Sequence, residues 1–133
     1  MHLRNFSLIL GEDGNISLAP VYDFVSVAPY SAEFHSGLLA LPLLEKEEGE
    51  ATLAAGFDTQ YGCYLGMDFI EFGQNIGMSE KLCQKLLRDL PKSAEKITNI
   101  YQHSFMPEEH KQQVLQCYQQ RLKYLQIFDE PKL

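Results

Sequence analysis

The sequence lacks any run of apolar residues long enough to cross a membrane as a helix. Residues 1–10 also lack the basic start, long apolar stretch and small-residue cleavage site of a secretory signal peptide. Basic residues are few, since 11 Lys and Arg stand against 18 Asp and Glu and the net charge is −7. Nucleic-acid affinity depends mainly on phosphate contacts by clustered Lys and Arg. We therefore expect a cytoplasmic protein that does not enter a membrane and does not bind nucleic acid directly.

Cysteine is also scarce. Cys63, Cys83 and Cys117 are odd in number, widely separated, and follow neither C-x-x-C nor zinc-finger spacing. This pattern predicts neither a disulfide framework nor a zinc site. Each thiol is expected to behave as a small buried apolar side chain, which agrees with a reducing compartment.

Nucleotide-binding loops are missing as well. The sequence contains no G-x-G-x-x-G, no G-x-x-x-x-G-K-[ST] and no V-A-I-K-like element. Hydrophobic residues make up 45% and charged residues 22% of the chain, which is close to the average for globular proteins. We expect one domain over residues 1–133 with no phosphate-covering loop of its own.

The most informative part of the chain is its first 26 residues. Two apolar runs, Phe6–Leu10 and Ile16–Val21, flank the segment Gly11–Asn15, whose residues favour turn conformations. This pattern predicts a β-hairpin in which the numbers of paired residues sum to about 26. Asn5 and Asp23 would then lie at the same open end. Hard cations such as Mg²⁺ bind side-chain oxygens of this kind, so the hairpin predicts a metal-phosphate site.

Residues 27–66 are predicted to form an irregular connector with one short strand or helix, because Pro and Gly interrupt its apolar clusters. The acidic run Glu45–Glu50 is interpreted as a solvated loop, the alternative being a site for a cation or a basic partner. His35 is expected to be a surface or structural residue rather than a catalytic one.

Four helices are predicted over residues 67–128. Asp68 is expected to cap the first helix, which ends at Gly77, and Ser79 to cap the second, which ends at Pro91. The third opens at Pro91, and the fourth and longest starts at Pro107. The predicted fold class is therefore mainly α (α+β), with a hairpin, a connector and a bundle of about four helices.

Two further groups of residues in the helical part receive structural interpretations. The run Glu108–His110 is expected to be an exposed first turn, because neighbouring helix positions do not converge on one ion. The aromatic residues at helical spacing are expected to lie in the core: Tyr101, Tyr118, Tyr124 and Phe128.

The hairpin motifs also resemble a known family. Asn5-Phe6-Ser7, Leu18-Ala19-Pro20 and Tyr22-Asp23-Phe24-Val25-Ser26 look like the N-F-S and L-A-P-x-Y-D-x-x-S motifs of HipA-like serine/threonine kinases, the toxins of bacterial toxin-antitoxin modules. The resemblance implies a kinase C-lobe, ATP and Mg²⁺ as cofactors, and Asn5 and Asp23 as the metal and cofactor ligands.

The same resemblance places the catalytic base outside this chain. His2-Leu3-Arg4-Asn5 match the end of the family's D-x-H-x-K-N loop, with Arg4 replacing the commoner Lys, and the catalytic Asp would come directly before Met1. By the same comparison, Ser26–His35 would help to position the substrate. The 133 residues are thus expected to lack catalytic activity alone.

Two hypotheses follow from these observations. In the first, the chain is the C-terminal part of a HipA-like kinase that phosphorylates Ser or Thr on a protein, which the resemblance extends to aminoacyl-tRNA synthetases, and that a DNA-binding antitoxin neutralises. In the second, it is a non-catalytic interaction module that binds an antitoxin or a partner lobe. Without the resemblance, an Asp after a strand is more often a turn residue or a helix cap.

Overall fold

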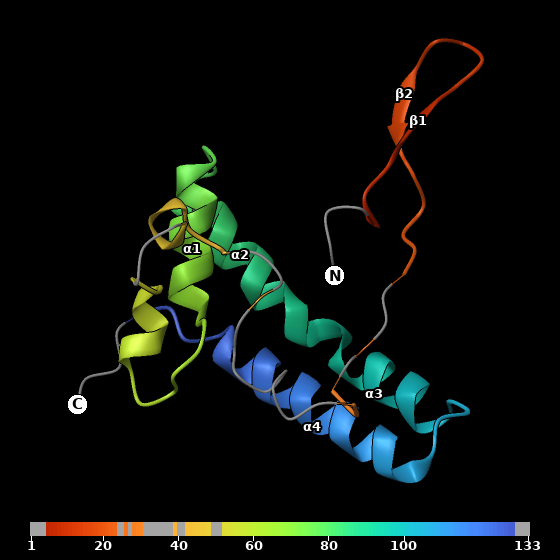
Figure 1. The fold of residues 1–133 in the computed structure, drawn as a ribbon, viewed down its shortest axis with the longest axis vertical. Helices are drawn as coiled ribbons and strands as arrows, with labels where there is room; N and C mark the ends of the chain where they lie inside the picture. The colour runs from red at the N-terminus through yellow and green to blue at the C-terminus, as the bar shows by residue number, and fades with distance from the viewer. Residues whose placement is uncertain are drawn as a thin grey trace.

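The computed structural model describes residues 5–23, 26, 28–30, 39, 42–48 and 52–129. Within these ranges the protein is mainly α with a small β part, which confirms the predicted fold class (Figure 1). The elements in chain order are β1 (Leu8–Leu10), β2 (Ile16–Leu18), the 3₁₀ helices η3 (Glu45–Glu47) and η4 (Ala55–Asp58), α1 (Gly66–Asn75), α2 (Glu80–Asp89), the 3₁₀ helix η5 (Leu90–Ser93), α3 (Ala94–Gln102) and α4 (Glu108–Tyr124).

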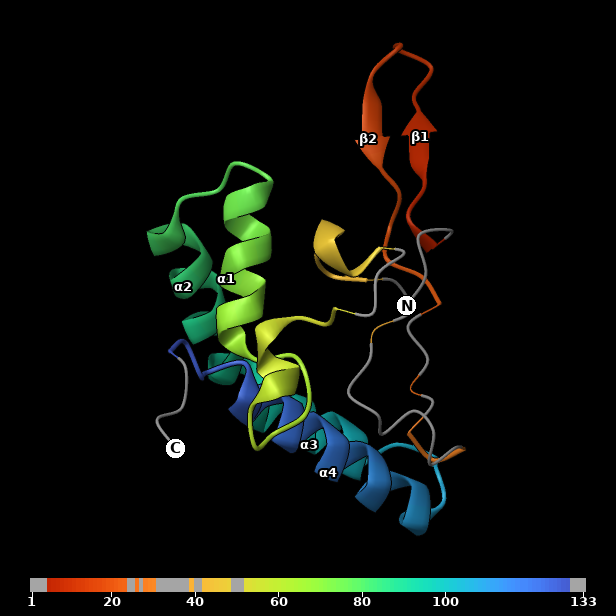
Figure 2. The ribbon, with the colours of Figure 1, turned by 60° about the vertical axis from the view of Figure 1, so that its left-hand side comes forward.

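The hairpin has the predicted register. Leu8 lies opposite Leu18 and Leu10 opposite Ile16, so the paired numbers sum to 26. The strands are shorter than the apolar runs, because regular pairing stops at residues 8 and 18. Gly14 adopts φ 79° in the turn, a left-handed conformation that glycine accepts without steric cost. The hairpin tip projects beyond the helices (Figures 1 and 2).

The first two helices end and begin where the sequence predicted. Gly77 has φ 88°, and its N–H donates to the carbonyl of Gln74 while the N–H of Met78 donates to that of Gly73, both at 2.9 Å. This pair of bonds is a Schellman C-cap. Ser79 then caps α2, because its hydroxyl accepts from the N–H of Leu82 at 3.3 Å.

Proline sets the remaining helix boundaries. Pro91 lies in η5, which joins α2 to α3 without a loop, and Pro107 directly precedes α4.

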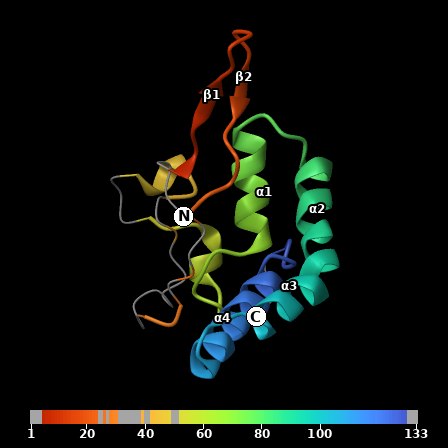
Figure 3. The same cartoon turned by 90° about the vertical axis from the view of Figure 1, so that its right-hand side faces the viewer.

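In Figure 3 α1 and α2 lie side by side, and α4 runs back along α3. No helix in the described ranges is both long and apolar enough to cross a membrane.

The prediction that Asp68 caps α1 is wrong. The helix begins two residues earlier, at Gly66, and Asp68 is its third residue. One carboxylate oxygen accepts from the N–H of Leu65 at 2.8 Å and the other from the N–H of Gly56 at 3.1 Å. Asp68 is only 1% exposed. Its contact with Gly56, twelve residues away, depends on tertiary structure that a local pattern does not contain.

The prediction of a solvated acidic loop is wrong at Glu47. This residue lies in η3 and is buried, whereas Glu45 and Glu48 are exposed. The carboxylate accepts hydrogen bonds from the N–H groups of Leu43, Leu44 and Ala54 at 2.9–3.1 Å and from the Tyr64 hydroxyl at 2.8 Å. Gly49 and Glu50 lie outside the described residues. A buried carboxylate with four donors is here a structural group, and it ties together three separate parts of the connector, at residues 43–44, 54 and 64.

Two apolar clusters form the core of the helical part. The first contains Leu44, Ala54 and Tyr64. The second contains Ile70, Cys83 and Leu87, with Leu125 and Phe128 packed against it. All three thiols are free; Cys63 and Cys83 are buried and Cys117 is half-buried. The four aromatic residues predicted to be core, Tyr101, Tyr118, Tyr124 and Phe128, are only partly buried.

Candidate functional site

The structure brings Asn5 and Asp23 together at the base of the hairpin. The Asn5 amide nitrogen (Nδ2) lies 3.1 Å from the Asp23 side-chain oxygen Oδ2 and 3.1 Å from the Asp23 backbone oxygen. Asp23 is exposed and Asn5 half-buried. Two polar side chains 18 positions apart in the sequence therefore contact each other at a solvent-accessible site.

The hairpin builds this spot through a short ladder of hydrogen bonds below its strands. The N–H of Ala19 donates to the carbonyl of Ser7 at 2.8 Å, and the Ser7 and Tyr22 hydroxyls lie 2.7 Å apart. Together these bonds carry the strand pairing down to Asn5 and Asp23. Ser7 and Tyr22 support the Asn5–Asp23 pair. The sequence did not predict this role for them, although both lie in the hairpin motifs.

Asp23 has an unusual backbone conformation. Its φ of 55° is the only positive value at a non-glycine residue among the described residues. Asp tolerates the left-handed region better than most residues, yet the conformation is sparsely populated and occurs often at functional sites. In this conformation the carboxylate and the backbone oxygen of Asp23 both accept from the Asn5 amide.

The pair has the chemistry that a magnesium ion requires. Asp23 offers carboxylate oxygens, and Asn5 offers an amide oxygen once its amide group is turned by 180°, an orientation that the hydrogen-bond network alone assigns. Mg²⁺ commonly uses one or two protein ligands and completes its shell with water and phosphate oxygens. Among the described residues there is no cluster of three or more His, Cys, Asp or Glu that could hold a metal ion.

Several residues singled out in the sequence fall outside the described residues, namely His2, Leu3, Arg4 and His35. Ser26 is described; its hydroxyl accepts from the N–H of Ala28 at 3.4 Å, which closes a local turn. Glu108 and Glu109 are exposed in the first turn of α4, and the His110 ring meets the edge of Tyr30 at 5.3 Å between centroids. Glu108 and Glu109 thus lie in an exposed first helical turn, as the sequence predicted.

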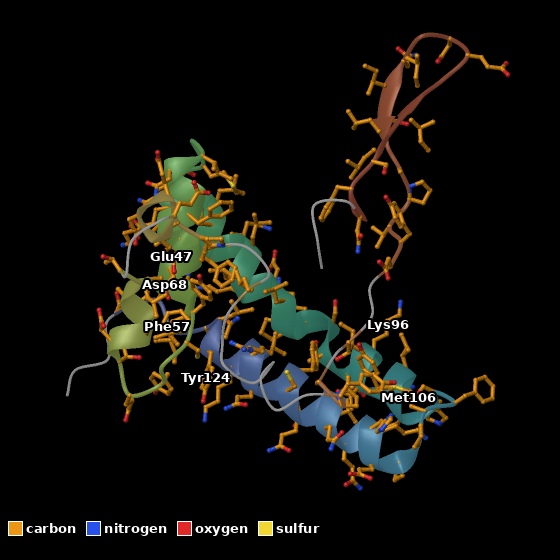
Figure 4. All side chains as sticks on the ribbon, in the orientation of Figure 1. Glu47, Phe57, Asp68, Lys96, Met106 and Tyr124 are labelled. Atoms are coloured by element: carbon orange, nitrogen blue, oxygen red, sulfur yellow. The ribbon has the colours of Figure 1, made fainter. Side chains whose placement is uncertain are left out.

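A second group of polar residues contains Glu47 and Asp68, which lie near each other in Figure 4, and Tyr64, whose hydroxyl donates to Glu47. Asp68 belongs to α1 and accepts a hydrogen bond from the N–H of Gly56 in η4. Burial and the hydrogen bond donated to Glu47 raise the pKa of Tyr64 to about 12. Its hydroxyl therefore stays protonated and keeps donating over the physiological range. Within the described residues, the hydrogen bonds of these two carboxylates come from backbone N–H groups and from the Tyr64 hydroxyl, so the two carboxylates have a structural role.

These observations define a class of protein. It is a mainly α domain with an Asn–Asp pair at the base of an N-terminal hairpin. The family model described as "HipA-like C-terminal domain" matches residues 1–98. The chain therefore belongs to the HipA-like C-terminal domain family. A Haemophilus influenzae protein named "Putative kinase" is 53% identical over 134 residues, which cover 100% of this chain and 39% of that relative. The chain thus spans about two fifths of the relative's length.

Proposed function

We propose that this chain is the C-terminal portion of a HipA-like serine/threonine protein kinase. The observation that carries the proposal is the approach of Asn5 to Asp23, at 3.1 Å, in a member of a family with a relative named as a kinase. Asn5 and Asp23 would hold Mg²⁺ with the phosphates of ATP. The helical part would form the scaffold beneath this site. The catalytic Asp and the nucleotide-covering lobe would come from the part of the protein that the relative has in addition.

Within this proposal each residue has a stated task. When bound, Mg²⁺ neutralises phosphate charge and stabilises the negative charge that develops during phosphoryl transfer. Asp23 supplies a carboxylate, and its left-handed backbone holds that carboxylate toward Asn5. The hydrogen bond between the Ser7 and Tyr22 hydroxyls holds the two arms of the hairpin together below the strands. The chain's own contribution is positioning, on which phosphoryl transfer depends strongly.

The biological role extends the same proposal. The kinase would act in the cytoplasm as the toxin of a toxin-antitoxin module and would phosphorylate Ser or Thr on a protein such as an aminoacyl-tRNA synthetase. A DNA-binding antitoxin would neutralise it and would carry it to DNA, since the chain itself has no dense basic cluster.

The test is Asp23→Ala in the full-length protein. We expect loss of magnesium-dependent ATP binding and at least a ~100-fold loss of phosphate transfer, because one of two protein ligands is removed. Isothermal titration with ATP, with and without Mg²⁺, and transfer of radiolabelled phosphate measure both effects. Asp13→Ala is the matched control, since Asp13 lies at the turn of the same hairpin, where its carboxylate accepts hydrogen bonds from Asn15.

Retention of full magnesium-dependent ATP affinity in Asp23→Ala would reject the metal role. A full-length protein that binds no ATP but retains a protein partner would favour the second candidate, a non-catalytic interaction module for an antitoxin or a partner lobe. The absence of glycine-rich phosphate-binding motifs from the 133 residues is the observation behind that alternative.

A further inference from the structure

One face of the hairpin is apolar and uncovered. Side chains alternate between the two faces of a strand, so Leu8, Leu10, Ile16 and Leu18 share one face. They are 69%, 70%, 68% and 63% exposed. We call these four residues the apolar hairpin face. The other face carries Ser17 opposite Ile9, and Ser7 and Ala19 continue it below the strands.

Such a face has the pattern of a sheet that is buried on one side. In β2, Ser17 separates Ile16 from Leu18, and such alternation is typical of a half-buried antiparallel sheet, whereas β1 is aliphatic at all three positions. A two-stranded hairpin is only marginally stable in water without a layer packed on it. The hairpin pairing that carries Asn5 and Asp23 therefore needs a covering layer to be held firmly.

The described helices do not pack on the hairpin as part of either apolar cluster. The buried members of both apolar clusters come from residues 44–87, and the residues packed against them from 43–128. No hairpin residue belongs to either cluster. Figures 1 and 2 show the paired strands standing away from α2, α3 and α4.

We propose that the apolar hairpin face is the docking surface for the portion of the longer protein that precedes this segment. The chain covers 39% of its relative, so more than half of such a protein lies outside it. Elements consecutive in sequence usually pack together, and β1 is the first strand of the described residues and so the strand nearest in sequence to that preceding portion. The inference rests on the part of the proposed function that places this chain in a longer protein, and it requires neither Mg²⁺ nor ATP.

A second copy of the chain fits this face less well. Two hairpins stacked in parallel would bring their acidic turns, each with Glu12 and Asp13, together. Stacked antiparallel, they would place each turn beside the other copy's Asp23. Like charges oppose both arrangements. Four aliphatic side chains also offer less than the roughly 800 Å² per partner that a stable dimer buries.

The first experiment maps the occupant directly in the full-length protein without nucleotide. Leu10→p-benzoylphenylalanine places a photocrosslinker on the apolar hairpin face, and Ser17→p-benzoylphenylalanine places it on the opposite face of the same hairpin. We expect an intramolecular crosslink from position 10 to a peptide that precedes residue 1, at least fivefold above the yield from position 17. Crosslinks to α1–α4, a covalent dimer, or equal yields from the two positions would overturn the proposal.

The second experiment leaves the sequence unchanged and measures hydrogen exchange of the full-length protein without ATP. A covered hairpin should exchange its strand amides at least tenfold more slowly than the exposed turn at Glu12, at every protein concentration. Exchange as fast as in the turn, or protection that disappears on dilution, would contradict the proposal. Because ATP is absent, failure here is separate from failure of the magnesium site, which is tested by Asp23→Ala.

Discussion

The buried carboxylates Glu47 and Asp68 have pKa shifts of opposite sign although they lie in the same part of the molecule (Figure 4). Burial raises the pKa of Glu47, but hydrogen bonds from Leu44, Tyr64, Ala54 and Leu43 outweigh it, so the net shift is downward. Burial also raises the pKa of Asp68, and its two backbone donors do not compensate. Asp68 is more deeply buried than Glu47, has fewer donors and lies near the Glu71 carboxylate, and these differences together give the two pKa shifts their opposite signs.

Glu47→Gln tests how much the four donors contribute. An amide has only one acceptor oxygen, and its NH₂ group would face backbone N–H groups, so we expect the free energy of unfolding to fall by about 2–3 kcal/mol. Urea unfolding followed by circular dichroism measures the change. Glu48→Gln is the matched control, since Glu48 is an exposed neighbour, and it should change stability by less than about 0.5 kcal/mol. Equal effects at the two positions would contradict the structural role of Glu47.

The opposite pKa shifts predict opposite pH dependences. The stability that ionised Glu47 provides is present above its unfolded pKa of about 4.5 and is lost as the pH falls through its lower folded pKa. For Asp68, ionisation costs stability at neutral pH, and the cost disappears as the pH falls through its raised folded pKa toward 3.8. Between pH 7 and pH 3, wild type should therefore lose stability relative to Glu47→Gln and gain it relative to Asp68→Asn. Two curves of the same sign would refute the assignment.

At the scale of the elements, α1 and α2 approach closely at Gly73. A Cβ at this position would collide with the Sγ atom of Cys83 on α2. The Schellman cap at Gly77 then turns the chain into α2, and a Cβ there would meet nothing within 4 Å. One glycine is thus required by packing and the other by its backbone conformation.

Gly73→Ala and Gly77→Ala should destabilise for these different reasons. We expect a loss of about 1 kcal/mol for Gly77→Ala, from the left-handed conformation, and about 1–3 kcal/mol for Gly73→Ala, from overpacking. Adding Cys83→Ala should restore much of the stability of Gly73→Ala and none of that of Gly77→Ala. Thermal unfolding of the single and double variants measures this coupling, and equal rescue of both would argue against the contact.

Local signals predicted most element boundaries, and long-range contacts account for the errors. The turn glycines set the hairpin register, and Gly77, Ser79, Pro91 and Pro107 ended or began helices, because each acts on the backbone of its immediate neighbours. The approach of Asn5 to Asp23 followed from that register. The roles of Glu47 and Asp68 depend on donors as far as 17 and 12 residues away, and no short pattern records them.

For the whole molecule, the segment after α4 holds the helical part together. The N–H of Met67 donates to the carbonyl of Ile127 at 2.9 Å, and the Gln126 side chain donates to the carbonyl of Leu87 at 2.8 Å. A Cβ at Gly66 would collide with the carbonyl oxygens of Leu125 and Ile127. The chain's last described residues therefore seal the start of α1 and the end of α2.

Phe128→Ala measures how much the segment after α4 contributes to the stability of the helical part. Phe128 packs against the cluster of Ile70, Cys83 and Leu87, so its truncation should cost about 2 kcal/mol. Phe105→Ala removes the same atoms from a fully exposed position between α3 and α4 and should change stability by less than about 0.5 kcal/mol. Chemical denaturation of the two variants compares them, and similar losses would mean that the terminal segment does not support the core.

The contacts between residues 125–128 and the first turn of α1 decide where an expressed segment of this protein can end. The family match ends at residue 98, inside α3, yet the seal comes from residues 125–128. A shortened open reading frame that stopped at the matched span would leave half a helix, an uncovered apolar cluster and a first turn of α1 without its partner. Such a product should accumulate in inclusion bodies rather than fold, so the usable expression boundary lies beyond Phe128.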